Sequence, residues 1–475
     1  MRVAFLSSEA VPFAKTGGLG DVAGALPKAL EGAGVDVALV HPLYDTTERR
    51  HLEEKVFDNL EVEWLGQRRR VGVWFSESAG APAFLIESPE YFARGRVYGF
   101  PNDHYRFAFF SRAALALMGR LGLGAPDIIH GNDWPCGFAL VWLLAGRPWG
   151  GFLSRTRSVL SIHNLAYQGT FDPGDLWRLG FRPGDETNVF MSNGAASSLK
   201  AGLMTCDAIT TVSRRYSYEI QTPEQGNGLD WLLRQRQDRL VGITNGVDFD
   251  VWNPETDPHL AANYSAEDLS GKRACKLDLL RRFGLPQDAE RPVVATISRL
   301  VAQKGYDLIK AASWQILETG AFFVALGSGE GEYEQLLQSL KDHAPNRVGV
   351  FRGFNEPLAH QIEAGADIFL MPSLYEPCGL NQMYSMRYGT VPVVRATGGL
   401  DDTVEQFDAS RGTGTGFKFE HYSAHAMMDK LREALFWYGR PEAWRRVQLN
   451  GMAVDNSWEA AAKKYVRVYE AVMSL

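Results

Sequence analysis

The segment Pro292-Val293-Val294-Ala295-Thr296-Ile297-Ser298 begins a second series of short apolar runs in a chain of 475 residues. A first series fills the N-terminal half. Between the two series lies a polar, proline-containing stretch, which follows the turn Asn245-Gly246-Val247-Asp248. In both series short β-branched runs alternate with longer patterns typical of helices, and such alternation indicates βα units and parallel sheets. The restart therefore predicts two α/β domains in tandem.

The predicted fold is two Rossmann-like, doubly wound parallel-sheet domains that face each other across a cleft. We expect a first domain over residues 1–245 and a second over 246–456. Residues 457–475 form a helix that either packs on its own domain or crosses back to the first. Strands are predicted at residues 3–7, 36–41, 127–130, 158–163, 208–213, 240–244, 292–298, 322–326, 348–352, 367–372 and 391–396. Ligands of such sheets bind beyond the carboxyl ends of the strands, so a shared site is expected in the cleft.

The composition argues against some classes of partner and indicates the cellular compartment. A hydrophobic content of 45% and a charged content of 22% are typical of a soluble globular protein. The net charge of −7 argues against a nucleic acid or an anionic membrane as partner. The four cysteines are scattered, which favours a reducing compartment and neither a disulfide framework nor a zinc site. Because the chain opens directly on a predicted strand and holds no apolar run of membrane-spanning length, we expect a cytoplasmic protein.

The loop Lys15-Thr16-Gly17-Gly18-Leu19-Gly20-Asp21 has the character of a phosphate site. Gly17 and Gly18 remove side-chain bulk where backbone amides must approach a ligand, and the following helix adds the positive end of its dipole. Lys15 adds an ammonium group and Asp21 a carboxylate, a set that suits a ligand that is part phosphate and part polyol. A glycine-rich loop with a solvated lysine is the alternative interpretation.

Two segments of the second domain carry further candidates. In Ser298-Arg299-Leu300-Val301-Ala302-Gln303-Lys304-Gly305, both Arg299 and Lys304 can face one anion, such as a departing diphosphate. In Glu376-Pro377-Cys378-Gly379-Leu380, the turn exposes backbone amides to sugar hydroxyls while Glu376 faces positive charge that develops on a sugar ring. Cys378 is not expected to be a nucleophile.

The segment Thr397-Gly398-Gly399 repeats the glycine pair before a helix N-terminus, and a capped loop without ligand is its alternative interpretation. In the first domain, Asp133 and His163 end two predicted strands. We expect both side chains to bind sugar hydroxyls, with Tyr167 and Gln168 close by. The aromatic segment 91–110, which contains Asn102, either lines a glucan groove or supplies ordinary core aromatics.

Five of these motifs occur in an order that resembles a known family: residues 15–19, 163–169, 298–305, 376–380 and 397–404. The chain resembles bacterial glycogen synthases and plant starch synthases, the retaining GT-B glycosyltransferases of family 5, along almost its whole length. The resemblance implies transfer of glucose from a nucleotide sugar, most often ADP-glucose, to the non-reducing end of an α-1,4-glucan, with no metal or other cofactor.

The resemblance also implies roles for single residues. Lys15 and the backbone of Gly17 and Gly18 would contact the donor phosphates, and Arg299 and Lys304 the diphosphate. Asp133 and His163 would hold the transferred glucose, Glu376 would be the essential carboxylate, and the 378–380 backbone would bind sugar hydroxyls. We place Thr397, Gly398 and Gly399 with the donor, and Asp21, Asn102, Tyr167 and Gln168 with the acceptor.

Two positions depart from related patterns. The family usually has His-x-His-Asp-Trp-His where this chain has His130-Gly131-Asn132-Asp133-Trp134-Pro135, which puts a role for flanking histidines in doubt. Related retaining enzymes often have a second glutamate eight residues after the first, and here that position is Tyr384.

Three alternatives are weighed against the synthase. The residues do not decide between ADP-glucose and UDP-glucose. A nicotinamide-dependent oxidoreductase is disfavoured, because the glycines at 18, 20 and 24 have the wrong spacing and lie too far from their strand. A glucan-binding scaffold without activity is disfavoured, because the cations and the carboxylate described above are all present.

Overall fold

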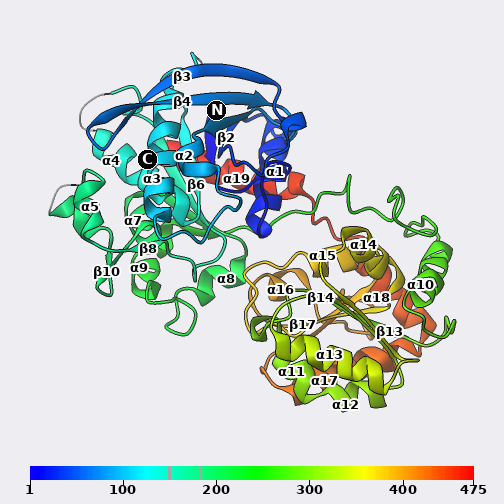
Figure 1. Ribbon diagram of the computed structural model, residues 1–475. Coiled ribbons are helices and arrows are strands. Elements are labelled where there is room, and N and C mark those ends of the chain that lie inside the picture. Colours follow the sequence, from blue (N-terminus) through cyan, green and yellow to red (C-terminus); the bar gives the residue numbers. More distant parts are fainter. Residues whose placement is uncertain (123, 148–150, 182–183) are drawn as a thin grey trace. The chain divides into compact units, whose positions relative to one another are not determined.

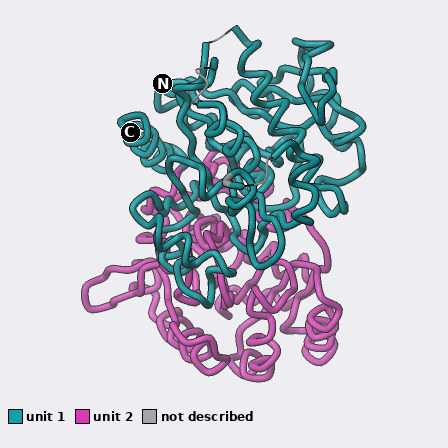
Figure 2. The backbone as a smooth tube through the Cα atoms, turned by 90° about the vertical axis from the view of Figure 1, so that its left-hand side faces the viewer, with its two compact units in different colours: residues 1–246, 458–475 teal, residues 247–457 magenta. Residues whose placement is uncertain are grey.

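The computed structural model describes residues 1–122, 124–147, 151–181 and 184–475, and the chain divides into two compact units. Unit 1 comprises Met1–Gly246 together with Trp458–Leu475, and unit 2 comprises Val247–Ser457 (Figure 2). Both ends of the chain therefore belong to unit 1.

Unit 1 is built on a nine-stranded sheet within the described residues, in the order β12-β11-β7-β6-β1-β2-β5-β4-β3. All neighbours from β12 to β5 are parallel, whereas β4 is antiparallel to both β5 and β3. The strands are β1 (Arg2–Leu6), β2 (Asp36–Pro42), β3 (Glu54–Trp64), β4 (Gln67–Ser76), β5 (Ala83–Glu87), β6 (Ile128–Asn132), β7 (Arg157–Ile162), β11 (Ala208–Thr211) and β12 (Leu240–Gly242). A small separate sheet holds β8 (Thr170–Phe171), β9 (Met191–Ser192) and β10 (Ala195–Ser197).

The helices of unit 1 lie mostly in the connections between these strands (Figure 1). They are α1 (Gly18–Gly32), α2 (Pro89–Phe92), α3 (Asp103–Met118), α4 (Gly137–Gly146), α5 (Asp175–Arg178), α6 (Asp185–Asn188), α7 (Ser198–Thr205), α8 (Arg214–Glu219), α9 (Asp230–Gln235) and the terminal α19 (Trp458–Met473).

Unit 2 has a six-stranded, fully parallel sheet in its described residues, in the order β15-β14-β13-β16-β17-β18. Its strands are β13 (Val293–Ile297), β14 (Phe322–Gly327), β15 (Val348–Arg352), β16 (Ile368–Met371), β17 (Val391–Arg395) and β18 (Phe417–Phe419). Its helices are α10 (Ser270–Arg282), α11 (Tyr306–Ala311), α12 (Ser313–Glu318), α13 (Gly331–His343), α14 (Glu356–Gly365), α15 (Asn381–Arg387), α16 (Gly398–Thr403), α17 (Ala424–Tyr438) and α18 (Pro441–Met452).

Every run predicted as a strand forms a parallel strand, and the doubly wound α/β class is confirmed. In each sheet the strand order reverses beside the first strand of the unit. The reversal falls between β1 and β6 in unit 1 and between β13 and β16 in unit 2. Ligands of doubly wound folds bind at such switch points, beyond the carboxyl ends of the strands. The loops that follow these four strands are therefore where the candidate residues should lie.

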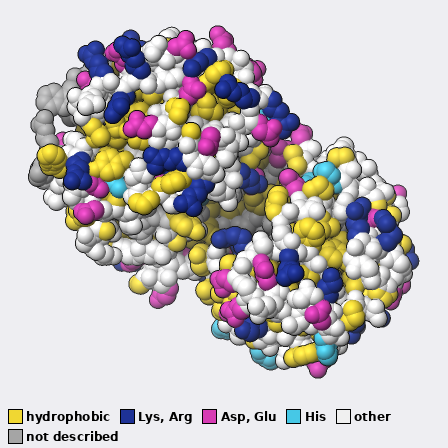
Figure 3. Space-filling model, in the orientation of Figure 1, with side chains coloured by type: hydrophobic (Ala, Val, Ile, Leu, Met, Phe, Trp, Pro, Cys, Tyr) yellow, Lys and Arg dark blue, Asp and Glu magenta, His cyan; other side chains and the backbone are white. Residues whose placement is uncertain are grey.

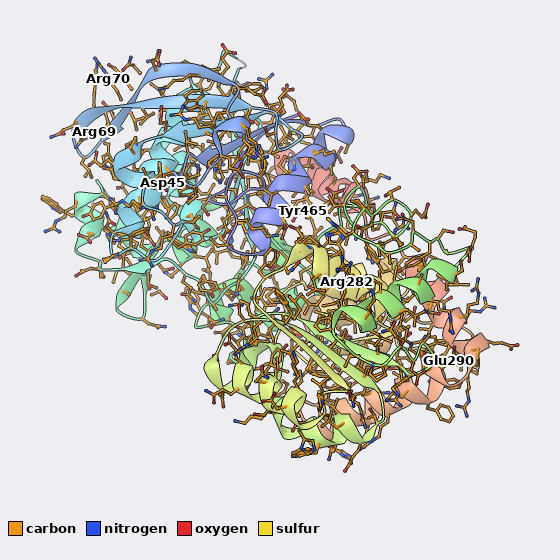
Figure 4. All side chains as sticks on the ribbon, turned by 45° about the vertical axis from the view of Figure 1, so that its right-hand side comes forward. Asp45, Arg69, Arg70, Arg282, Glu290 and Tyr465 are labelled. Atoms are coloured by element: carbon orange, nitrogen blue, oxygen red, sulfur yellow. The ribbon has the colours of Figure 1, made fainter. Side chains whose placement is uncertain are left out.

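Helix α19 packs in the core of unit 1. Its Tyr465 and Tyr469 are buried among apolar side chains of β1, β2 and α1, and α19 lies beside α1 in Figure 1. His130 on β6 lies 2.7 Å from the hydroxyl of Tyr469, measured from Nδ1. Tyr465, labelled in Figure 4, lies on the same helix with its ring centroid 5.8 Å from that of His130.

Two surface properties complete the description. On the face drawn in Figure 3, Lys and Arg side chains are interspersed with Asp and Glu. Among helices of the described residues, none combines the length and the apolar character that a membrane-spanning segment needs.

Candidate functional site

An ion pair stands at the switch point of unit 2. Lys304 follows β13, Glu376 follows β16, and Lys304 Nζ lies 2.6 Å from Glu376 Oε2. The side chains are 19% and 8% exposed. The hydroxyl of Ser373 donates a second hydrogen bond to the same Oε2 at 3.0 Å. Glu376 is thus held on one oxygen by two donors, which fixes the orientation of its carboxylate.

A glycine allows this approach. Lys304 ends a 3-10 turn (Ala302–Lys304), and Gly305 after it has a left-handed backbone with φ of 81°. A Cβ at position 305 would collide with the carbonyl oxygen of Pro372, at the end of β16. The two loops can therefore lie in contact only because residue 305 has no side chain.

Arg299 is exposed at the end of β13, and its Nη2 donates to Gln303 Oε1 at 3.2 Å. Gln303 in turn joins the two loops. Its Nε2 donates to the Tyr375 carbonyl at 3.3 Å, and its carbonyl accepts the Leu374 amide at 2.8 Å. Gln303 was not singled out from the sequence, because a glutamine in a loop carries no signal of its own.

The turn at residues 376–380 rests on the glycine pair of α16. The Gly399 amide donates to the Glu376 carbonyl at 3.1 Å. A Cβ on Gly398 would collide with the Glu376 carbonyl, and one on Gly399 with that of Cys378. The pair therefore has a structural task, close packing beneath the Glu376 turn. Contact of Thr397, Gly398 and Gly399 with a donor stays a prediction.

Cys378, Gly379 and Leu380 complete the turn before α15. Gly379 has φ of 71°, and Gln382 Nε2 donates to the Cys378 carbonyl at 3.2 Å and to the Gly379 carbonyl at 3.0 Å. Since these carbonyls are taken by the first turn of α15, the turn has a fixed shape.

In unit 1, the Lys15 loop lies between β1 and α1. Lys15 Nζ pairs with Asp21 Oδ1 at 2.6 Å, with both side chains partly exposed. A Cβ at Gly17 or Gly18 would meet no atom within 4 Å, whereas one at Gly24 would meet the Val11 carbonyl at 2.7 Å. The chain itself therefore leaves open space at positions 17 and 18, which is what a ligand approaching the backbone requires.

Asp133 follows β6 at the unit 1 switch point, and it lies beside His163, which follows the neighbouring strand β7. The His163 amide donates to Asp133 Oδ1 at 2.8 Å, and Asp133 has a left-handed backbone with φ of 54°. Such a conformation is strained for a residue with a side chain and clusters at functional sites. Burial raises the pKa of Asp133 to about 7, against the effect of amide hydrogen bonds from His163 and Asn164.

Asn132 determines which ring nitrogen of His163 carries the proton. Asn132 Nδ2 donates to the Leu6 carbonyl at 2.9 Å, so its Oδ1 is the atom that faces His163 Nε2 at 2.9 Å. Nε2 must then carry the proton, because a carbonyl oxygen only accepts. Burial lowers the pKa of His163 to about 4, so the ring is neutral near pH 7, with Nδ1 as an acceptor. Asn132 stands where the family usually has a histidine, and it orients His163.

The predicted acceptor residues are less closely grouped. Asn102 Oδ1 accepts a hydrogen bond from Arg94 Nη1 at 3.0 Å, and Gln168 Nε2 donates to the Asn227 carbonyl at 2.8 Å. Tyr167 is 59% exposed. In the aromatic segment the core interpretation holds for the rings of Tyr91, Phe92, Phe107, Phe109 and Phe110, which are buried.

Phe354 is a candidate that the sequence analysis missed. It lies two residues beyond β15, at the same carboxyl edge of the sheet as Arg299 and Glu376, and it is 82% exposed. An aromatic ring in water at a ligand-binding edge is a surface on which a planar ring can stack. An isolated Phe-Asn pair in the sequence gives no sign of this exposure.

Comparisons with known proteins identify the family. Residues 2–235 match the family described as starch synthase catalytic domain, and residues 280–446 match glycosyl transferases group 1. A glycogen synthase of Koribacter versatilis is 46% identical over 99% of this chain and 98% of its own length. A glycogen synthase of an Anaeromyxobacter species is 46% identical over 99% of both chains.

A solved structure agrees with these relatives. The catalytic domain of starch synthase IV from Arabidopsis thaliana, bound to ADP and acarbose, is 35% identical, with a TM-score of 0.90 over 100% of this chain and 99% of that one. The matches are to glycosyltransferases, and they give no support to an oxidoreductase. The chain therefore belongs to the glycogen and starch synthase family of GT-B glycosyltransferases.

Proposed function

We propose that the protein transfers glucose from ADP-glucose to the non-reducing end of an α-1,4-glucan, with retention of configuration and without a metal ion. The observation that carries the proposal is the Lys304–Glu376 pair at 2.6 Å, at the switch point of unit 2. The pair supports a role of Lys304 as a cation for the diphosphate and of Glu376 as a carboxylate for the sugar. The similar starch synthase, solved with ADP and acarbose, supports a nucleotide and a glucan as the two ligands.

The cations bind the leaving group, which is the nucleoside diphosphate. Arg299, Lys304 and Lys15 bind the diphosphate and offset the charge that develops as its bond to glucose breaks. The Gly17 amide already donates to Glu9 Oε2. The open space at Gly18 supports an approach of phosphate oxygens to the next amide, at the N-terminus of α1.

The carboxylates, the histidine and the 378–380 backbone contact the transferred glucose. Glu376 faces the positive charge on the oxocarbenium-like glucose, and the 378–380 backbone binds its hydroxyls. Asp133 and the neutral His163 hold other hydroxyls of the same ring, since Nδ1 of His163 can accept a hydrogen bond. The oxygen of the acceptor hydroxyl then forms the new bond on the face from which the nucleoside diphosphate departed, and its proton passes to the departing diphosphate.

Phe354 is proposed as the platform for the nucleobase. Its 82% exposure and its position beyond β15 support stacking of a planar ring. Asp21, Asn102, Tyr167 and Gln168 remain the proposed acceptor contacts, and the exposed Tyr167 ring is the one most open to a glucan. We also propose a cytoplasmic location, on the basis of the cysteine pattern.

The test is glucose incorporation into glycogen, with EDTA present and with ADP-glucose or UDP-glucose in parallel. The proposal expects incorporation from ADP-glucose, and release of the added glucose by an exo-hydrolase specific for α-1,4 linkages. Incorporation from UDP-glucose alone would correct the donor. Loss of activity in EDTA that added metal restores would refute metal independence. Binding of glycogen without turnover of either donor would indicate a scaffold.

A further inference from the structure

An internal carboxylate occupies the Gly17 amide, one of the two backbone amides that the sequence analysis assigned to a phosphate, and the Thr16 amide before it. Glu9 lies between β1 and the Lys15 loop and is 4% exposed. Its Oε2 accepts the Thr16 amide at 2.5 Å and the Gly17 amide at 2.9 Å. Two successive amides that converge on one oxygen are a typical anion-binding arrangement. Here the anion belongs to the chain.

The other oxygen of Glu9 is held as firmly. The Tyr98 hydroxyl donates to Glu9 Oε1 at 2.9 Å and lies 2.8 Å from Ser8 Oγ. Burial, together with the charge of Glu9, raises the pKa of Tyr98 well above its usual value, so the hydroxyl keeps its proton and donates. Glu9 is therefore bound by three donors and has a fixed position.

The segment that carries Tyr98 is itself anchored. The Gly95 amide donates to Asp45 Oδ1 at 2.9 Å, and the buried Arg106 donates from Nη1 to the Val97 carbonyl at 2.9 Å. Asp45 is labelled in Figure 4. Tyr98 donates to Glu9, and Glu9 accepts the amides of residues 16 and 17, so this anchored segment is connected to the Lys15 loop by hydrogen bonds.

The next amide is left for a ligand. Gly18 begins α1, a helix of 15 residues, and its amide has no recorded hydrogen-bond partner among residues 1–122, 124–147, 151–181 and 184–475. Unlike Thr16 and Gly17, Gly18 thus keeps an amide available at a helix N-terminus, beside space that no side chain fills.

We propose that Glu9 is a positioning residue for donor binding. It holds the Thr16 and Gly17 amides so that the Gly18 amide and Lys15 face the donor phosphate, and it stays in place when the donor binds. This inference rests on the proposed function. Displacement of Glu9 by the phosphate is the opposite account, because a carboxylate and a phosphate would then compete for the same amides.

Variants of Glu9 separate geometry from charge. Glu9→Gln keeps an oxygen that can accept the two amides, whereas Glu9→Asp keeps the charge on a side chain one methylene shorter. The positioning role predicts that ADP binding, measured by calorimetry, weakens roughly tenfold or more in Glu9→Asp and Glu9→Ala. In Glu9→Gln it should stay within about threefold of the unsubstituted protein. Glycogen binding should not change in any of them. Glu48→Gln, at an exposed glutamate paired with Arg50 at 2.9 Å, is the control.

Tighter ADP binding in Glu9→Gln would overturn the proposal in favour of competition, and unchanged binding in Glu9→Asp would overturn it outright. If Glu9→Ala does not fold, the difference in ADP affinity between Glu9→Asp and Glu9→Gln still distinguishes the positioning role from competition with the phosphate. Failure of the unsubstituted protein to bind ADP would instead refute the proposed function, and the Glu9 role with it.

Discussion

Lys304 Nζ lies 2.6 Å from Glu376 Oε2, although the two residues are separated by 72 positions in the chain. The pair exists because β13 and β16 are neighbours in the unit 2 sheet, and because Gly305 lets the two following loops touch. Each charge offsets the other in a mostly buried place, so removal of either leaves a charge without its partner.

Loss of Lys304 should therefore be severe. Lys304→Ala is expected to lower kcat/KM for ADP-glucose about 100- to 1000-fold, the scale of one preorganised electrostatic contact. Lys310→Ala is the matched control, since Lys310 pairs with Glu332 at 2.8 Å with both side chains 53% exposed. Steady-state kinetics of both variants make the comparison, and near-normal kcat/KM in Lys304→Ala would refute the assignment.

Gly18 and Gly24 should respond in opposite ways to the same substitution. Gly18→Ala adds a methyl group into space that the chain leaves open, so Tm should hold or rise slightly while KM for ADP-glucose rises. Gly24→Ala meets the Val11 carbonyl at 2.7 Å, so it should lower Tm. Thermal unfolding and donor kinetics on both variants test this. An unchanged donor KM in Gly18→Ala would mean that nothing approaches that backbone.

Phe354 should affect the nucleotide and not the sugar. Phe354→Ala is expected to weaken ADP binding by about 1–3 kcal/mol, the range found for stacking of one base on an aromatic ring. Tm should barely change, because the ring is 82% exposed. Phe436→Ala, at another exposed ring of unit 2, is the control. Calorimetric titration with ADP measures the effect, and equal affinities in the two variants would exclude stacking.

Asp133 should make stability depend on pH. Its pKa is about 7 in the folded protein against 3.8 for the free group, so the folded state binds the proton more tightly. The stability that this group contributes is complete below 3.8 and is lost as the pH rises through about 7. Asp133→Asn removes the ionisable group and so has no such loss, and it keeps the size and shape of the side chain.

The Tm of Asp133→Asn minus that of the unsubstituted protein should therefore grow between about pH 4 and pH 8. Differential scanning calorimetry at several pH values measures this difference. A constant difference across the range would mean that Asp133 ionises normally in the folded protein.

Much of the fold could be predicted from local patterns. Parallel strands buried on both faces, such as Val293–Ile297 and Phe322–Gly327, are continuous apolar runs that the sequence displays directly. The helix at Trp458–Met473 is visible from its apolar spacing. The candidate residues Arg299, Lys304 and Glu376 were visible because each follows such a run.

The features that could not be predicted depend on contacts between residues that are distant in the sequence. The hairpin of β3 and β4 was not predicted, because β3 and the first half of β4 carry charged ladders such as Glu61 opposite Arg70. Glu9, Asn132 and Gln303 act by hydrogen bonds to other loops, and only the folded chain brings those loops together. The second glycine pair resembles the first in sequence, yet it packs beneath Glu376, whereas the first borders open space.

The most direct test of the central claim is the rate of ADP release from ADP-glucose with glycogen present, for the unsubstituted protein and for Glu376→Gln. Glutamine keeps the shape of the side chain and removes its charge. The account predicts rapid release that requires glycogen in the unsubstituted protein, and a fall of about 100- to 1000-fold in kcat in the variant. Release at a similar rate by both proteins would contradict it.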